Sequence, residues 1–169
     1  MAEIKNKKNK KMEKKYKYTG ETLRLANGTI LYRIQATRSF GDVSAGDLGG
    51  WIAKEENLSH DGSAWVAEEA KVYENATILG DAQLVGEAMA FGDATCCGEA
   101  HVSENARIYG SAWVFGQAEI SGKVKVFGSA KIYGKAQAYG QAWVCGHATL
   151  RGYAKAWGNE MVAGNTEAY

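Results

Sequence analysis

The hydrophobic positions between Ala64 and Ala156 recur every six residues. Every sixth residue from Ala64 to Ala154 is Ala, except for Val124, and the residue two positions later is usually aliphatic. Two positions later again, between residues 68 and 164, Gly occurs fourteen times in seventeen, and the exceptions are Glu68, Glu74 and Glu104. The repeat unit is A-x-(V/I/L)-x-G-x, and a repeat this short and regular determines the architecture.

Polar and hydrophobic residues also alternate within each repeat. Ala, the aliphatic residue and Gly fall on even numbers, whereas Lys, Arg, Gln, Tyr and Trp are concentrated on odd ones. A period of two predicts an extended backbone with one side facing a core. A helix is excluded because each Gly would cost about 1 kcal/mol relative to Ala, and one continuous strand is excluded because strands usually have about 3–10 residues. The chain must therefore turn once per repeat, at Gly, which tolerates a positive φ.

Three extended segments joined by corners close a triangle of about 18 residues, and successive triangles stack at about 4.8 Å. The segment from Ala64 to Tyr169 predicts about six such coils. The repeat resembles that of the left-handed parallel β-helix, or hexapeptide-repeat, superfamily, in which an aliphatic residue is paired with a small one four positions on, as Val66 is with Ala70. In this chain Gly follows the aliphatic residue by two positions rather than one.

The resemblance covers about two-thirds of the chain and implies an all-β fold, a single-stranded left-handed parallel β-helix that forms a triangular solenoid. The left hand is implied by the resemblance alone. Because crossovers between parallel strands are generally right-handed, a right-handed solenoid remains the alternative.

A different pattern precedes the repeat. Between residues 21 and 37, apolar and polar residues alternate on both sides of Asn27-Gly28, a dipeptide typical of a type I′ hairpin turn. This pattern predicts a β-hairpin whose apolar side is formed by Leu23, Leu25, Ile30, Tyr32, Ile34 and Ala36.

These patterns divide the chain into three parts. Residues 1–17 contain eight Lys and two Glu and are expected to be a flexible, lysine-rich tail, with nucleic acid or another acidic partner as the alternative. Residues 18–51 are expected to cap the first coil, and this Gly-rich leader resembles the one that precedes hexapeptide repeats in phage-encoded and bacterial proteins labelled putative transferases. Residues 52–169 are expected to form the β-helix, with Ile52 and Leu58 in the position of Ala.

Composition and the cysteine positions bear mainly on the cellular compartment. No apolar run approaches eighteen residues and no secretory signal is present, so neither a membrane span nor export is expected. Cys96 falls on an inward position, whereas Cys97 and Cys145 fall on different outward faces and are not expected to form a disulfide. We therefore expect a cytoplasmic protein.

No catalytic, metal or cofactor site is predicted. His60, His101 and His147 occupy three different positions of the repeat, so they are not expected to share a metal ion. The Gly-rich leader has no Gly-Lys-Ser/Thr, which excludes a phosphate loop. Hexapeptide acyltransferases, which the repeat resembles, typically interrupt the coil with a loop that carries a catalytic His. Here the frame runs from Ala64 to Ala156 without an inserted residue.

Outward residues eighteen apart in sequence should stack on one of three faces. The second face carries Trp113, Phe115 and Tyr133, and the third is more polar. The first face combines cations with aromatic rings, and two interpretations are open. Such a face suits packing between the subunits of a trimer. It also suits binding of a planar anionic ligand in a cleft between subunits, with the rings stacked on a base and the cations paired with a phosphate. The predicted ligand-binding residues are Lys71, Tyr73, Phe91, Arg107, Tyr109, Lys125 and Phe127.

Three functions are compatible with this pattern. The first is a non-catalytic homotrimer that holds a small anionic, nucleotide-like ligand, similar to the sponge proteins by which phages are thought to sequester immune signals. The second is an acyltransferase that uses acetyl-CoA, and the third is a structural or virion-associated solenoid. The six-residue order decays after Ala156, so we also expect the far end to be covered by a second oligomer or by a partner.

Overall fold

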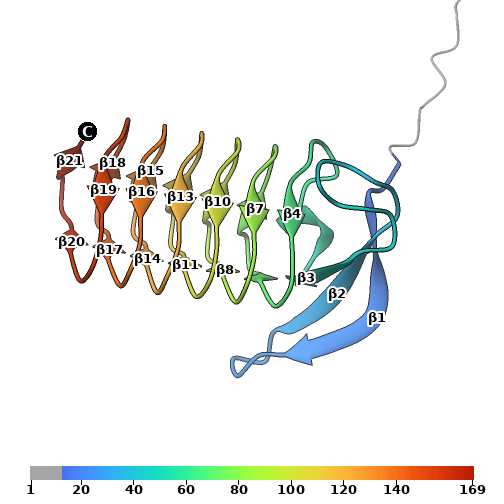
Figure 1. Ribbon diagram of the computed structural model, residues 1–169. Helices are drawn as coiled ribbons and strands as arrows, with labels where there is room; N and C mark the ends of the chain where they lie inside the picture. Colours follow the sequence, from blue (N-terminus) through green and yellow to red (C-terminus); the bar gives the residue numbers. More distant parts are fainter. Residues whose placement is uncertain (1–12) are drawn as a thin grey trace, which may run out of the picture.

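The structure is a computed structural model that describes residues 13–169, and it is a parallel β-solenoid of about seven turns with 18-residue spacing (Figure 1). Its three flat faces are the sheets A, B and C. Sheet A has nine strands, β1 (Tyr16–Arg24), β2 (Ile30–Ala36), β3 (Leu48–Ile52), β5 (Lys71–Val72), β8 (Met89–Ala90), β11 (Arg107–Ile108), β14 (Lys125–Val126), β17 (Trp143–Val144) and β20 (Met161–Val162).

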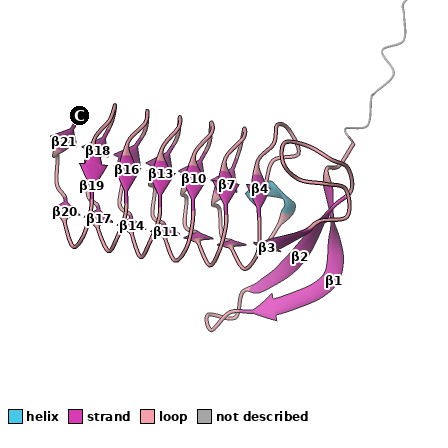
Figure 2. Ribbon diagram, in the orientation of Figure 1, coloured by secondary structure: helices cyan, strands magenta, loops and turns pink. Residues whose placement is uncertain are grey.

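The other two faces have six strands each. Sheet B contains β6 (Thr77–Ile78), β9 (Thr95–Cys96), β12 (Trp113–Val114), β15 (Lys131–Ile132), β18 (Thr149–Leu150) and β21 (Glu167–Ala168). Sheet C contains β4 (Trp65–Val66), β7 (Gln83–Leu84), β10 (His101–Val102), β13 (Glu119–Ile120), β16 (Gln137–Ala138) and β19 (Lys155–Ala156). A short 3-10 helix, η1 (Glu55–Asn57), follows β3 (Figure 2).

The coil interior is formed by the even-numbered residues, as the period of two predicts. The Ala and aliphatic positions from Ala64 to Val162 are buried almost completely, and Cys96 is among them. Strand residues pair with those eighteen positions on, for example Arg107 with Lys125. The inside-outside assignment and the register of the three faces are therefore confirmed. The left hand of the coil stays a prediction from the resemblance.

Each corner is built around a residue with positive φ. In place of Gly, Glu68 and Glu74 adopt φ values of 55° and 56°, and their carboxylates accept hydrogen bonds from the N–H groups of Gly86 (2.9 Å) and Gly92 (2.8 Å) in the next coil. Such a bond offsets part of the strain that a side chain brings to this conformation. The exceptions to the Gly pattern therefore keep the corner geometry.

The frame of the first coil differs from the prediction. Ile52 pairs with Val72, and Leu58 forms a bridge with Ile78, so both partners lie twenty residues away rather than eighteen. Ile52 and Leu58 therefore occupy the aliphatic position, and their assignment to the Ala position was wrong. The two additional residues lie between Leu58 and Val66, where a turn at residues 59–63 widens the first coil.

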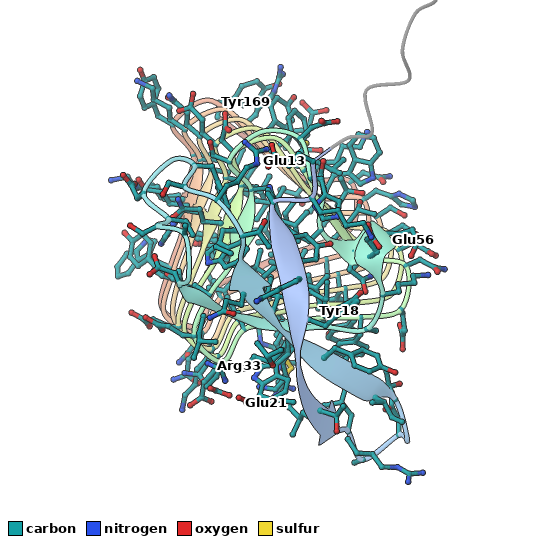
Figure 3. The ribbon with its side chains drawn as sticks, turned by 90° about the vertical axis from the view of Figure 1, so that its right-hand side faces the viewer. Glu13, Tyr18, Glu21, Arg33, Glu56 and Tyr169 are labelled. Carbon is teal, nitrogen blue, oxygen red and sulfur yellow. The ribbon has the colours of Figure 1, made fainter. Side chains whose placement is uncertain are left out.

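The predicted hairpin is confirmed, but its faces are different from those expected. Strands β1 and β2 are antiparallel, and β2 continues sheet A by pairing with β3. Leu31 and Ile34 are buried, whereas Ile30 and Tyr32 are 46% and 37% exposed. The register shift at residues 33–35 explains this, because a one-residue slip turns every following side chain to the other face. Seen along the coil axis, the hairpin projects beyond the coils (Figure 3).

The cap covers the first coil with hydrogen-bond donors. Lys15 is fully buried, and its Nζ donates to the carbonyl oxygens of Ala64 (2.7 Å) and Gly62 (3.4 Å). The hydroxyl of Tyr16 donates to the carbonyl of Leu58 at 2.9 Å. Both residues belong to the segment expected to be a tail, of which residues 1–12 lie outside the described residues. The carbonyl groups at this edge are thus satisfied by a Lys and a Tyr rather than by another coil.

We expect the stabilising effect of Lys15 to depend on pH. Its burial, with a smaller effect from Arg38, lowers the pKa of Lys15 from 10.5 to about 8. The unfolded chain therefore binds more protons than the folded protein between about pH 8 and 10.5, and the contribution of Lys15 to the free energy of unfolding rises over this range. Denaturant unfolding of wild type and Lys15→Met at pH 8, 9 and 10 should give a difference that increases with pH. The exposed Lys17→Met variant is the control, and a constant or decreasing difference for Lys15→Met would contradict the assignment.

Candidate functional site

Four of the predicted site residues form a continuous stack of aromatic rings beside sheet A. The ring centroids of Tyr73 and Phe91 are 5.0 Å apart, those of Phe91 and Tyr109 4.9 Å, and those of Tyr109 and Phe127 5.0 Å. Neighbouring rings are within 3° of parallel. We call these four residues the ring ladder. The 18-residue coil brings them together because it places the same position of successive coils one strand spacing apart.

The predicted cations lie on the strands beside the ladder, but only two are neighbours. Arg107 on β11 pairs with Lys125 on β14, whereas Lys71 on β5 is separated from Arg107 by Met89. The Nζ of Lys125 lies 4.5 Å from the ring centroid of Trp143, and the Nζ of Lys71 donates to the backbone carbonyl of Glu69 at 2.8 Å. The positive charge on this face is therefore concentrated at Arg107, which is exposed, and Lys125, which is half-buried.

The cap covers one end of the ring ladder. Tyr73 is only 9% exposed, because it packs in a cluster with Leu31 and Trp51, and Phe91 lies at the edge of this cluster. Tyr109 is half-buried; burial raises its pKa, and Arg107 opposes this effect only in part, so the hydroxyl keeps its proton at neutral pH. The accessible part of the candidate site is therefore centred on Arg107, Tyr109, Lys125 and Phe127.

The ladder rings do not offer their faces to a ligand. Phe91 and Tyr109 each have a ring stacked on both faces, so only their edges are directed outward. The expectation that these rings stack on a base is therefore wrong for the middle of the ladder. The edge of an aromatic ring carries positive partial charge, and it suits an anion or a hydrogen-bond acceptor.

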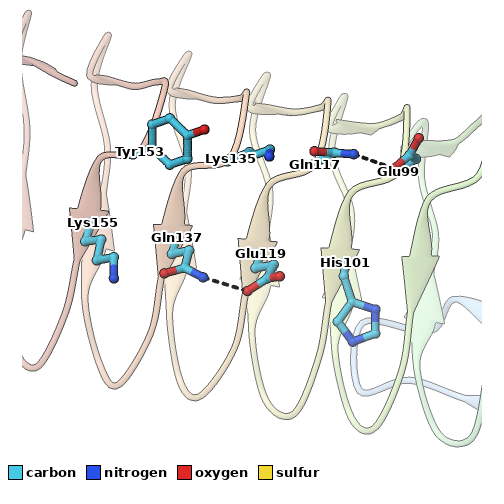
Figure 4. A pocket seen from close by; sticks show the side chains of 8 residues that line it. All are labelled: Glu99, His101, Gln117, Glu119, Lys135, Gln137, Tyr153 and Lys155. Carbon is cyan, nitrogen blue, oxygen red and sulfur yellow. Dashed lines mark hydrogen bonds between the residues drawn. The ribbon is translucent and has the colours of Figure 1, made fainter.

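Sequence reasoning missed a groove on sheet C, with a volume of about 590 Å³ (Figure 4). Within it, the side chain of Gln117 donates to Glu99 and that of Gln137 donates to Glu119, both at 2.8 Å. The polar character of this face was visible in the sequence, but a groove depends on the relative heights of neighbouring side chains. The groove is lined by Glu99, His101, Gln117, Glu119, Lys135, Gln137, Tyr153 and Lys155.

A second hollow lies on the same sheet, next to the cap, with a volume of about 340 Å³. Its walls come from the loop that precedes β3 and from the first two strands of sheet C. It is lined by Asp42, Val43, Asp47, Leu48, Trp65, Ala67, Gln83 and Val85.

The three histidines lie in three different environments. His60 is part of the cap, where its Nδ1 accepts from the N–H of Lys15 (3.2 Å), its Nε2 lies 2.9 Å from Glu55 and its ring stacks on Tyr16. His101 is exposed in the groove on sheet C, and His147 is exposed at a corner. Within residues 13–169, no group of three or more His, Cys, Asp or Glu side chains is arranged to hold a metal ion.

The repeat continues without an inserted loop, since every strand from Trp65 to Glu167 pairs with one eighteen residues away. In the described part of the chain, no helix is both long and apolar enough to cross a bilayer. The sequence matches no known protein family and no curated protein. The function is therefore inferred from the geometry of the chain itself.

Proposed function

We propose that the protein is a non-catalytic binding protein that assembles as a homotrimer through sheet A and sequesters a small anionic, nucleotide-like ligand in the clefts between subunits. The observation that carries this proposal is the ring ladder, flanked by Arg107 and Lys125. A continuous row of aromatic rings that are still partly exposed is a surface that a partner normally covers. The resemblance of the repeat to hexapeptide-repeat proteins supports a threefold arrangement.

The ligand chemistry follows from the groups beside the open half of the ladder. Arg107 supplies a planar guanidinium that can bind a phosphate through two hydrogen bonds, and Lys125 adds a point charge one strand away. The hydroxyl of Tyr109 is a neutral donor at this site. Since the ladder offers ring edges, a base would have to stack on a ring of another subunit, which is consistent with a site that is complete only in the oligomer.

The uninterrupted coil supports a binding role rather than an acyltransferase. A general base must lie within hydrogen-bond reach of the group from which it takes a proton. His101 is exposed on a flat strand of sheet C, on a different face from the ring ladder. The structural or virion-associated alternative requires no ligand at all, so a protein with that role would bind none of the nucleotides tested by calorimetry.

Isothermal titration calorimetry with nucleoside monophosphates and cyclic dinucleotides should identify a ligand that is recovered chemically intact. Arg107→Ala should weaken its binding by roughly 1–3 kcal/mol, about 5- to 150-fold, because a charge-assisted hydrogen bond is lost. Lys131→Ala, an exposed cation on sheet B, is the matched control and should bind as wild type does. Acetyl transfer from acetyl-CoA that is lost in His101→Ala would contradict the proposal, as would the absence of any binding.

A further inference from the structure

The outer side of sheet C has an asymmetric distribution of charge. Its residues form three rows that run along the coil axis, one step per coil. The leading row is Ser63, Asp81, Glu99, Gln117, Lys135 and Tyr153; the strand row is Trp65, Gln83, His101, Glu119, Gln137 and Lys155; the trailing row is Ala67, Val85, Ser103, Ser121, Tyr139 and Trp157. The carboxylates lie in the coils near the cap and in the middle, whereas both lysines lie in the distal coils.

Side-chain size is distributed in the same asymmetric way. In the distal coils, Tyr153 is 74% exposed, Trp157 63% and Tyr139 38%. In the coils next to the cap, the same rows contain Ser63, Ala67 and Val85, and the hollow of about 340 Å³ lies there. One end of the face therefore has protruding aromatic rings, and the other end has a depression.

We infer that sheet C binds the same face of a second copy of the chain, in antiparallel orientation. A two-fold axis in the plane of the face, between β10 and β13, turns one copy end over end and keeps each row opposite the same row. Strand β4 then lies opposite β19 of the second copy, β7 opposite β16, and β10 opposite β13. A two-fold interface of this kind uses the same patch on both subunits, so the patch must be complementary to itself.

The charges meet this condition. In the leading row, Asp81 lies opposite Lys135 of the second copy, and in the strand row His101 lies opposite Glu119. Lys155 lies opposite Trp65, close to the carboxylates of Asp42 and Asp47 that line the hollow. With the coils parallel, a two-fold axis would instead make the strand row face itself, so that Glu119 and Lys155 would each lie opposite the same residue of the second copy, and like charges opposite one another are unfavourable. The leading row would then face the trailing row, and Asp81 would lie opposite Val85 rather than a lysine.

The sizes meet the condition as well. In the trailing row, Trp157 lies opposite Ala67 and Tyr139 opposite Val85, so each large ring faces a small side chain. In the leading row, Tyr153 lies opposite Ser63. Leu48, which is 52% exposed, lines the hollow that would receive Trp157. Rings that fill a pocket are the usual anchors of protein interfaces.

The area sets the strength of this contact. Six strands of sheet C span about 24 Å along the axis, and a face about 17 Å wide gives roughly 400–500 Å² for each copy. The two copies together would bury about 800–1,000 Å², which is below the roughly 1,200 Å² of stable specific interfaces and corresponds to a weak, reversible contact. Since sheets A and C are different faces, the contact is independent of the proposed function, and it would join chains or trimers in a concentration-dependent way.

A charge exchange tests the pairing in the full-length protein. Sedimentation velocity over a range of concentrations should show that Lys135→Glu and Asp81→Lys each weaken self-association by at least about tenfold, because each places like charges across the interface. The double variant, with both changes, should recover association to near the wild-type value, because Asp81 and Lys135 exchange roles. Lys131→Glu on sheet B is the matched control for a charge reversal and should have no effect.

Two results would overturn the inference: single variants that associate as wild type does, or a double variant that is as weak as the single ones. Circular dichroism of each variant excludes unfolding as the cause. Failure of the proposed trimer can be distinguished from failure of the sheet C contact. The trimer is tested by the ring-ladder variants on sheet A, and its absence would leave the response of sheet C to the charge exchange unchanged.

Discussion

Ile120→Ala is expected to lower the free energy of unfolding by about 2–5 kcal/mol, which is one of the largest effects of any single change. Ile120 is fully buried and is stacked between Val102 and Ala138 of the adjacent coils. The cavity left by the substitution should remain open, because backbone hydrogen bonds between coils fix the positions of its walls. Denaturant unfolding at neutral pH measures the loss.

The matched control is Lys123→Ala at an exposed corner of the same repeat, for which we expect a change within about 0.5 kcal/mol. An equal loss at both positions would contradict the division of the coil into inward even residues and outward odd residues.

This division, and most of the fold, could be predicted from the sequence because the repeat encodes it many times. Each coil has the same three corners, so a single rule places Ala64 and Leu150 inside and Arg107 outside. The register of the sheets also follows from the rule, and the ring ladder was found because Tyr73 and Phe127 are separated by a multiple of eighteen.

The errors occurred where the repeat ends. The two additional residues after Leu58 and the register shift in β2 are single events, and no periodicity marks them. The burial of Lys15 could not be predicted, because a Lys among other lysines normally lies in solvent. Its position is determined by carbonyl groups of Gly62 and Ala64 that are distant in sequence.

The candidate site was predicted in part. The sequence places cations and rings on one face, but it does not specify ring orientation, because the stacking of Phe91 on both neighbours depends on how the side chains pack. The groove on sheet C was missed for a related reason. Its shape depends on side chains such as Tyr153 and Gln137, whose heights relative to their neighbours are a property of the packed surface.

Replacing Phe91, Tyr109 and Phe127 together with Ser is expected to abolish the threefold assembly. These three rings are the half-buried members of the ladder, and their loss removes the apolar surface that the proposed trimer buries. The interior of the coil is not changed, so the variant should keep its β-sheet circular dichroism and unfold cooperatively. Light scattering should detect single chains, or pairs held through sheet C, and no species of three chains.

The corresponding change on sheet B is the control for this variant. Trp113, Phe115 and Tyr133 include a second stacked pair of rings, and Trp113 is 48% exposed. Replacing these three residues with Ser should leave the assembly unchanged. If instead this variant dissociates and the ladder variant does not, the interface lies on sheet B.

In the proposed function, the ring ladder of sheet A builds an oligomer that holds a small anionic molecule without altering it. Native mass spectrometry of the wild-type protein, purified from cells without a competing ligand, detects both the oligomer and the bound molecule. We expect species of three chains, or multiples of three, that release an intact anionic small molecule on denaturation, and we expect neither for the ladder variant. Wild-type protein that contains only one or two chains, with nothing bound, would contradict the proposed function.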